Sequence, residues 1–104
     1  MAVYLGLDTS NYTTSTALFD TNSASVTQSK HLLPVKQGEL GLRQSDAVFH
    51  HVKQLPQIID GLNIAKSGIE LSGVGVSSCP RNVDGSYMPC FLVGETVAKT
   101  VSAL

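Results

Sequence analysis

Two strand-like stretches joined by a short polar turn constrain the fold of this chain most. Val3 to Asp8 (VYLGLD) puts every second side chain on one apolar face, which predicts a strand covered on both sides. Thr13 to Asp20 (TTSTALFD) is rich in residues that favour strands, so the two form a hairpin that turns at Ser10 to Tyr12. A third strand, Ser25 to Leu33, follows the turn Thr21 to Ser23, and the three predict an antiparallel meander.

The rest of the chain alternates helix and strand. A loop from Pro34 to Gln44 leads into a helix from Ser45 to Lys66, with its first residue as N-cap and a kink expected at Pro56. A short strand from Val74 to Ser78 and a second helix from Ser86 to Leu104 complete the order β-β-β-α-β-α. Each helix carries an apolar stripe, formed in the first by Val48, Val52, Leu55, Ile59 and Leu62 and in the second by Val93, Val97, Val101 and Leu104.

Length and composition limit the chain to one small α/β domain. It has 104 residues, of which 42% are hydrophobic and 14% charged, as in a globular protein. Seven basic residues against eight acidic ones leave no surplus charge to attract nucleic acid or an anionic membrane. No apolar run approaches the roughly 20 residues that span a bilayer, and the start lacks the basic region of a signal peptide. We therefore expect a cytoplasmic protein.

Two cysteines, Cys79 and Cys90, lack the spacing of a zinc site. Reduced thiols suit a cytosolic protein, and a disulfide requires that the fold bring the two together.

The adjacent histidines of FHHVKQLP invite a metal-site interpretation that helical geometry does not favour. On a helix, His50 and His51 point about 100° apart, and neither has a ligand three or four residues away. We expect His51 at the edge of the apolar face, making a hydrogen bond, and His50 facing solvent. His31, on the third strand, could join a metal site only through a proximity that the sequence does not predict.

The hairpin turn is unusually rich in hydroxyl groups. These are carried by Thr9, Ser10, Tyr12, Thr13, Thr14 and Ser15. Short hydroxyls and backbone N–H groups at such a tip suit phosphate oxygens, and Asp8 at the strand end suits a hydrated Mg²⁺. A threonine-rich edge hairpin explains the same composition equally well, because threonine favours strands.

Four segments resemble the O-sialoglycoprotein endopeptidase/glycoprotease family, in the order of that family. They are LGLDTSNYTTSTALFD, RQSDAVFHHVKQLPQII, GVGVSS and GSYMPCFLVGETVAKTVSAL. The better-understood members of this family transfer a threonylcarbamoyl group to adenosine in tRNA. The resemblance implies the actin/sugar-kinase ATPase fold, which has two lobes with ribonuclease-H-like cores. Residues 1–104 would form a partial N-terminal lobe with a mixed sheet, and the second lobe would be absent.

The sequence departs from the family pattern at two places. The acidic pair that follows the first Thr-Ser in typical transferases is replaced here by Asn11 to Thr14. The Gly-Pro-Gly loop after the fourth strand reads SSCPRNVDGSYMP. These differences indicate a divergent member. The His-x-x-x-His ligands of the family's zinc or iron would lie beyond this chain, which is therefore expected to be a fragment that is inactive alone.

The resemblance implies a nucleotide- or phosphate-binding site without catalytic residues in this chain. Its predicted members are Asp8, Thr9, Ser10, Thr13, Thr14, Ser78 and Gly85. ATP or a related nucleotide with Mg²⁺ is expected only in a full-length protein, with Asp8 holding the metal through water.

A second hypothesis is a non-catalytic interaction module. The apolar helices would pair with a second copy or a paralogous partner, and the bare edge of Val74 to Ser78 would also favour a dimer or larger oligomer. Transfer RNA would bind only to a full-length assembly, and no membrane association is expected. A third alternative is an unrelated small α/β domain.

Overall fold

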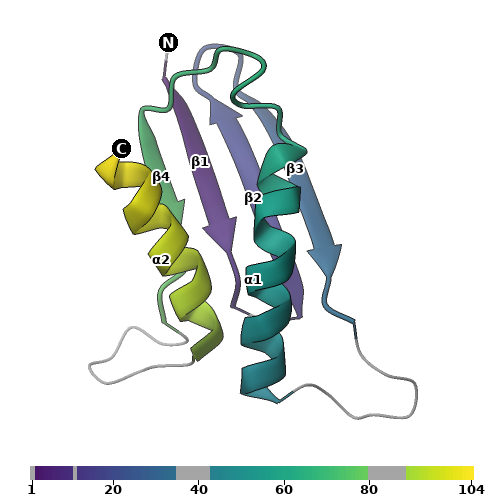
Figure 1. Ribbon diagram of the computed structural model, residues 1–104. Helices are drawn as coiled ribbons and strands as arrows, with labels where there is room; N and C mark the ends of the chain where they lie inside the picture. Colours follow the sequence, from purple (N-terminus) through teal and green to yellow (C-terminus); the bar gives the residue numbers. More distant parts are fainter. Residues whose placement is uncertain (1, 11, 35–42, 80–88) are drawn as a thin grey trace.

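The computed structural model describes residues 2–10, 12–34, 43–79 and 89–104, which form a mixed sheet with two helices on one face (Figure 1). The strands are β1 (Val3–Asp8), β2 (Thr13–Asp20), β3 (Ser25–Leu32) and β4 (Gly73–Val76), and the helices are α1 (Gln44–Asp60) and α2 (Pro89–Ala103). The element order is therefore the predicted one. The first two strands have the predicted bounds, and the others differ by one or two residues at an end.

The sheet has the order β3-β2-β1-β4. β1 pairs antiparallel with β2, as β2 does with β3, which confirms the meander. β4 instead pairs parallel with β1, with Leu7 opposite Val76. The carboxyl ends of β1 and β4 therefore lie together at the same end of the sheet. In the described sheet, β4 is an edge strand.

The core lies between the sheet and the two helices. Val3, Leu5 and Leu7 of β1 are buried there against Leu55 of α1 and Val93 of α2. On the other face of β1, Tyr4 is 44% exposed, and both helices lie on the opposite side (Figure 1). The prediction that β1 is covered on both sides is therefore wrong for the described residues.

Helix α1 differs from its prediction in bounds and in orientation. It begins at Gln44 after an extended Arg43 that makes no side-chain cap, and it ends at Asp60 with Pro56 inside it. The residues packed against the sheet are Ala47, His51, Leu55 and Ile58. Val52, placed in the apolar stripe by the sequence, is 56% exposed. The other four residues of the predicted stripe are buried in the core or pack against it, whereas Val52 lies beside α2 rather than over the sheet.

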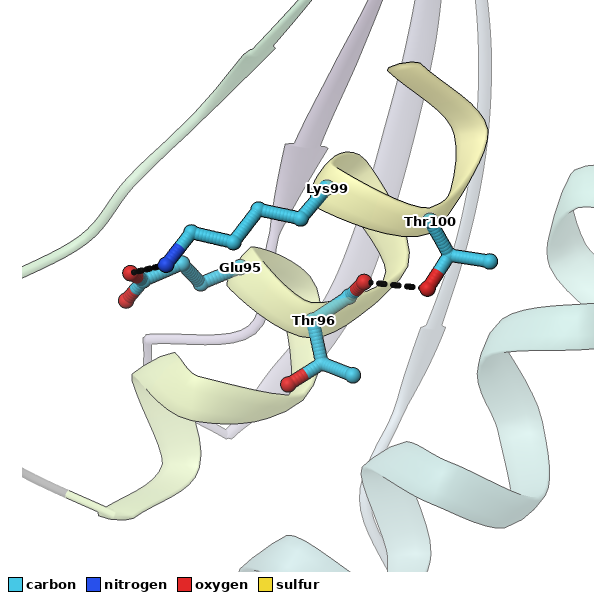
Figure 2. A network of polar contacts seen from close by, with 4 residues as sticks. All are labelled: Glu95, Thr96, Lys99 and Thr100. Atoms are coloured by element: carbon cyan, nitrogen blue, oxygen red, sulfur yellow. Dashed lines mark hydrogen bonds and ion pairs between the residues drawn. The ribbon is translucent and has the colours of Figure 1, made fainter. Parts of the chain in front are cut away.

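Helix α2 begins at Pro89, and the residues predicted to precede it lie outside the described part of the chain. It buries Cys90, Phe91, Val93, Gly94 and Ala98, whereas Leu104 is fully exposed. Small residues on this face allow a close approach to the sheet. Of the predicted stripe, Val93 is buried and Val97 packs against the core. Its outer face is polar, with Lys99 Nζ 2.9 Å from Glu95 Oε1 and the Thr100 hydroxyl donating to the Thr96 carbonyl at 2.8 Å (Figure 2).

Neither helix of the described residues has the length and apolar character needed to cross a membrane.

Candidate functional site

A carboxylate and two serines meet where β1 and β4 end. Asp8 is the last residue of β1, and Ser77 directly follows β4. Asp8 Oδ1 accepts hydrogen bonds from the Ser10 backbone N–H at 2.9 Å and from the Ser77 hydroxyl at 2.8 Å. The parallel pairing brings these residues together, because Ser77 N–H donates to the carbonyl of Leu7 at 3.2 Å.

These hydrogen bonds keep Asp8 ionised. Partial burial raises the pKa of Asp8. This effect is outweighed by groups that lower the pKa, namely hydrogen bonds from the Ser10 side chain and backbone, a hydrogen bond from Ser77, and the nearby His51. The pKa of Asp8 is therefore held below its ordinary value. A carboxylate that is exposed, ionised and already oriented is a suitable ligand for a hydrated divalent cation.

A shallow hollow of about 340 Å³ extends from Asp8 across the sheet. Its polar members are Asp8, Ser15, Thr16 and Ser77, and its lining includes Gly6 and Gly75. Asp8 and Ser15 are cross-strand partners in the β1–β2 pairing, so both belong to the same face. The hollow offers one negative charge and several hydroxyl groups at the carboxyl ends of parallel strands, the edge where ligands bind in open α/β sheets.

The side chain of Thr9 points toward α2 and not into the cluster of Asp8 and Ser10. Its side chain has no exposed surface, and its hydroxyl donates to the carbonyl of Cys90 at 2.7 Å and accepts from the N–H of Gly94 at 3.0 Å. The hydroxyl therefore binds the first turns of α2 and is inaccessible to a phosphate in this conformation.

Thr14 is also fully buried and binds the other helix. Its hydroxyl lies 2.8 Å from His51 Nδ1 and donates to Gln54 Oε1 at 3.0 Å, and both partners belong to α1. Of the seven predicted phosphate-site residues, the structure brings Asp8 and Ser10 into one cluster. Ser78 is exposed next to Ser77, Thr13 is half-buried at the start of β2, and Gly85 lies outside the described residues.

Ser77 is not among the residues predicted for this site, and Ser15 is counted among the hydroxyl groups of the turn but is not assigned to the phosphate site. The signal for Ser77 is its position directly after the apolar run VGV. A polar residue that follows a parallel strand lies at the same end of the sheet as the polar residues that follow the neighbouring parallel strand. Ser15 lies beside Asp8 only because of the hairpin register.

The two histidines of α1 differ in burial and in the residues that they contact. His51 is fully buried, so its prediction as a boundary residue is wrong, although its predicted hydrogen bond is confirmed. His50 is half-buried rather than solvent-facing, with its ring 5.2 Å from that of Phe49 in an edge-on contact. Within the described ranges, no three metal-ligating side chains are grouped to hold an ion.

An apolar groove of about 450 Å³ separates α1 from α2. Val48, Val52 and Pro56 line it on α1, and Leu92, Val93 and Val97 line it on α2. Val52 is 56% exposed and Leu92 is 49% exposed, and none of the described residues that line the groove is charged. This surface and the polar cluster at Asp8 are the candidate sites that we consider among the described residues.

The sheet order and the two helices on one face agree with the actin-like ATPase fold and its mixed α/β sheet, as the sequence predicts. Among solved structures, the chain is similar to YeaZ from Pseudomonas aeruginosa, with a TM-score of 0.67 and 16% sequence identity over 99% of this chain and 39% of that one. It is similar to the same extent (TM-score 0.67, 15% identity, 99% and 39% coverage) to a P. aeruginosa protein described as uncharacterized with similarity to the peptidase YeaZ.

The chain thus spans 39% of the length of the two solved structures. Neither a protein-family model nor a curated protein matches the sequence. The structural likeness confirms the fold, and it agrees with the glycoprotease resemblance of the sequence.

Proposed function

We propose that this chain is the N-terminal lobe of a glycoprotease-like protein and that it acts as an association module through the groove between α1 and α2. The groove carries the proposal, because half-exposed aliphatic side chains from two helices meet there and no charged residue is among its described lining. Apolar surface of this kind is stabilised when a partner removes it from water. Threonylcarbamoyl transfer to tRNA would belong to a larger assembly that contains a second lobe.

The occupant we propose is the same groove of a second copy. Leu92 and Val52 are about half exposed at the groove, so this face has both exposed apolar side chains and a concave part. A twofold axis through such a face places the exposed residues of each copy on the groove of the other. Because the described lining of the groove has no charged residue, it gives an acidic or basic partner no ion pair to form.

Sedimentation equilibrium of the 104-residue chain at about 100 μM tests this proposal, because even weak self-association is measurable there. Val52→Glu should weaken association at least about tenfold by burying an unpaired charge. Val26→Glu is the matched control, since Val26 is also 56% exposed but lies on β3, away from the groove. A wild-type chain that sediments as a monomer, or equal losses in both variants, would contradict the proposal.

A second candidate function is binding of a Mg²⁺–nucleotide phosphate at the end of β1. The observation that favours it is the ionised Asp8, held by Ser10 and Ser77 beside a 340 Å³ hollow. Asp8 would hold the hydrated cation, while the Ser10, Ser77 and Ser78 hydroxyls would approach the phosphate oxygens. Thr9 and Thr14 would support the turn from within the protein.

Calorimetry with Mg-ATP tests the second candidate. Asp8→Asn should abolish the heat of binding, because it removes the negative charge that attracts the cation. Asp20→Asn is a matched control, since Asp20 Oδ1 accepts from the N–H of Asn22 at 2.9 Å in the way that Asp8 accepts from Ser10, but at the end of β2. Unchanged binding by Asp8→Asn would exclude Asp8 from the site.

A further inference from the structure

The Thr9 hydroxyl bridges two backbone groups of α2 that an α-helix normally joins directly. It donates to the carbonyl of Cys90 and accepts from the N–H of Gly94, at 2.7 Å and 3.0 Å. These residues are four apart, which is the spacing of the helical hydrogen bond. A side chain placed at such a pair of groups influences the local course of a helix.

Gly94 makes this contact possible. A Cβ atom at position 94 would lie 3.0 Å from Thr9 Oγ1 and 3.1 Å from Val76 Cγ2. The absence of a side chain therefore lets α2 approach the ends of both β1 and β4. Because Thr9 lies between Asp8 and Ser10, the helix is anchored at the polar turn itself.

The residues held by this anchor include two that line the groove. Leu92 and Val93 lie in the helical turn between Cys90 and Gly94, and both contribute to the groove. Thr9 does not line the groove. The direction in which Leu92 faces a partner depends on how this turn of α2 is placed, and Thr9 fixes that turn from the sheet side.

Thr14 makes the equivalent contact with α1. Its hydroxyl binds His51 and Gln54, which belong to the helix that supplies the other wall of the groove. Each wall is thus hydrogen-bonded to the hairpin by one fully buried threonine, and the two threonines stand on either side of the turn.

We infer that Thr9 is a positioning residue for association: its hydroxyl sets the placement of the α2 turn that presents Leu92 and Val93 to the partner. This inference rests on the proposed association function. It assigns to the hairpin a role in protein contact that does not require a phosphate ligand. Loss of the hydroxyl should weaken association even though Thr9 is fully buried and does not line the groove.

Sedimentation equilibrium of three variants tests the inference. Thr9→Val keeps the shape of the side chain but removes the hydroxyl, and it should weaken association about tenfold, equivalent to ~1.4 kcal/mol. Thr9→Ser keeps the hydroxyl and should stay within about twofold of wild type. Thr16→Val is the matched control, because it deletes an equally buried hydroxyl that donates to the carbonyl of Ser29 at 2.9 Å within the sheet.

The Thr16→Val control separates an effect on the placement of α2 from a general loss of stability. Thr9→Val and Thr16→Val should both lower the free energy of unfolding, but only Thr9→Val should change the dissociation constant. Equal association of folded Thr9→Val and wild type would overturn the inference, as would an equal loss in Thr9→Ser. If Thr9→Val does not fold, Gly94→Ala tests the same contact from α2. Weaker association of this variant supports the inference, and unchanged association overturns it.

The result for Val52→Glu shows whether a failed prediction concerns the positioning role of Thr9 or the proposed association through the groove. If Val52→Glu associates like wild type, the groove is not the interface, and the proposed function fails whatever the Thr9 variants do. If Val52→Glu loses association and Thr9→Val does not, the interface stands and the anchor alone is wrong.

Discussion

The Thr14 hydroxyl lies 2.8 Å from His51 Nδ1, and neither side chain has any exposed surface. The direction of this hydrogen bond follows from its neighbours. Gln54 Nε2 donates to the carbonyl of Leu32 at 3.2 Å, which leaves Gln54 Oε1 to accept the single hydroxyl hydrogen of Thr14. Thr14 therefore accepts from His51, and Nδ1 carries a proton.

We predict that neutral His51 is the Nδ1–H tautomer. A long-range ¹H–¹⁵N correlation spectrum should show a protonated, pyrrole-type Nδ1, since the acceptor oxygen of Thr14 stabilises that form. Thr14→Val should abolish the preference by removing the acceptor. A pyridine-type Nδ1 in the wild-type protein would mean that Thr14 is the donor and that the Gln54 amide has the opposite orientation.

Thr14→Val should also lower the free energy of unfolding by ~1–3 kcal/mol, because it removes the acceptor of a buried donor. Thr14→Ser should retain most of the stability, since it keeps the hydroxyl and loses only a methyl group. Urea denaturation followed by circular dichroism measures both. Equal stability of the valine and wild-type proteins would show that the Thr14–His51 contact makes no net contribution.

The depressed pKa of Asp8 makes its contribution to stability dependent on pH. Its pKa is lower in the folded protein than the ordinary aspartate value of 3.8, so the folded state favours the ionised carboxylate. The contribution is therefore fully present above that value and is lost as the pH falls through the folded pKa. Urea denaturation should show the difference in stability between wild type and Asp8→Asn narrowing between pH 6 and pH 3. A constant difference would contradict this prediction.

Ser77→Ala provides an independent measure of the same carboxylate. It removes one of the hydrogen bonds that lower the pKa of Asp8, so a carboxyl ¹³C titration should show that pKa rising toward its ordinary value. Ser15→Ala is the control, because Ser15 lines the same hollow without a role in the pKa shift of Asp8.

The local pattern of the sequence was sufficient for the strands of the hairpin but not for the face of α1. Alternating apolar residues and threonine-rich composition located β1 and β2, since both signals come from the strand itself. His51 is buried because it meets the Thr14 hydroxyl, a partner that lies on another element. Val52 lies beside α2 for a similar reason, because helical periodicity does not show where the other helix packs.

The candidate site was partly predictable for a similar reason. Asp8 and Ser10 are close in sequence, so the composition of the turn indicated them. Ser77 joins them only through the parallel register of β1 and β4, which no local pattern specifies. Thr9 and Thr14 had the right chemistry for a phosphate, but the direction of their side chains depends on where the helices pack.

The Glu95–Lys99 ion pair on the outer face of α2 should contribute little to stability (Figure 2). Its atoms are 2.9 Å apart, but the lysine side chain is 76% exposed, so water and salt screen the attraction. Lys99→Ala should change the free energy of unfolding by no more than about 0.5 kcal/mol. A larger loss that persists in 1 M salt would indicate a contact other than the ion pair.

Gly94→Ala and Gly75→Ala should have opposite effects on the free energy of unfolding. Alanine is favoured over glycine inside a helix by about 1 kcal/mol, but a Cβ at position 94 meets Thr9 Oγ1 at 3.0 Å and Val76 Cγ2 at 3.1 Å. The hydroxyl is held by two hydrogen bonds and Val76 by strand pairing, so neither neighbour moves without loss of other contacts. The overlap should outweigh the helical preference and leave a net destabilisation of ~1–2 kcal/mol.

At position 75 a Cβ has no atom within 4 Å, because that face of β4 is not covered by a helix. Gly75→Ala should therefore be neutral or stabilise by up to about 1 kcal/mol through the lower entropy of the unfolded chain. Urea denaturation of the two variants under one set of conditions gives the comparison. If Gly94→Ala proves as stable as Gly75→Ala, α2 can withdraw from the sheet without penalty, and the close contact with Thr9 does not hold the helix in place.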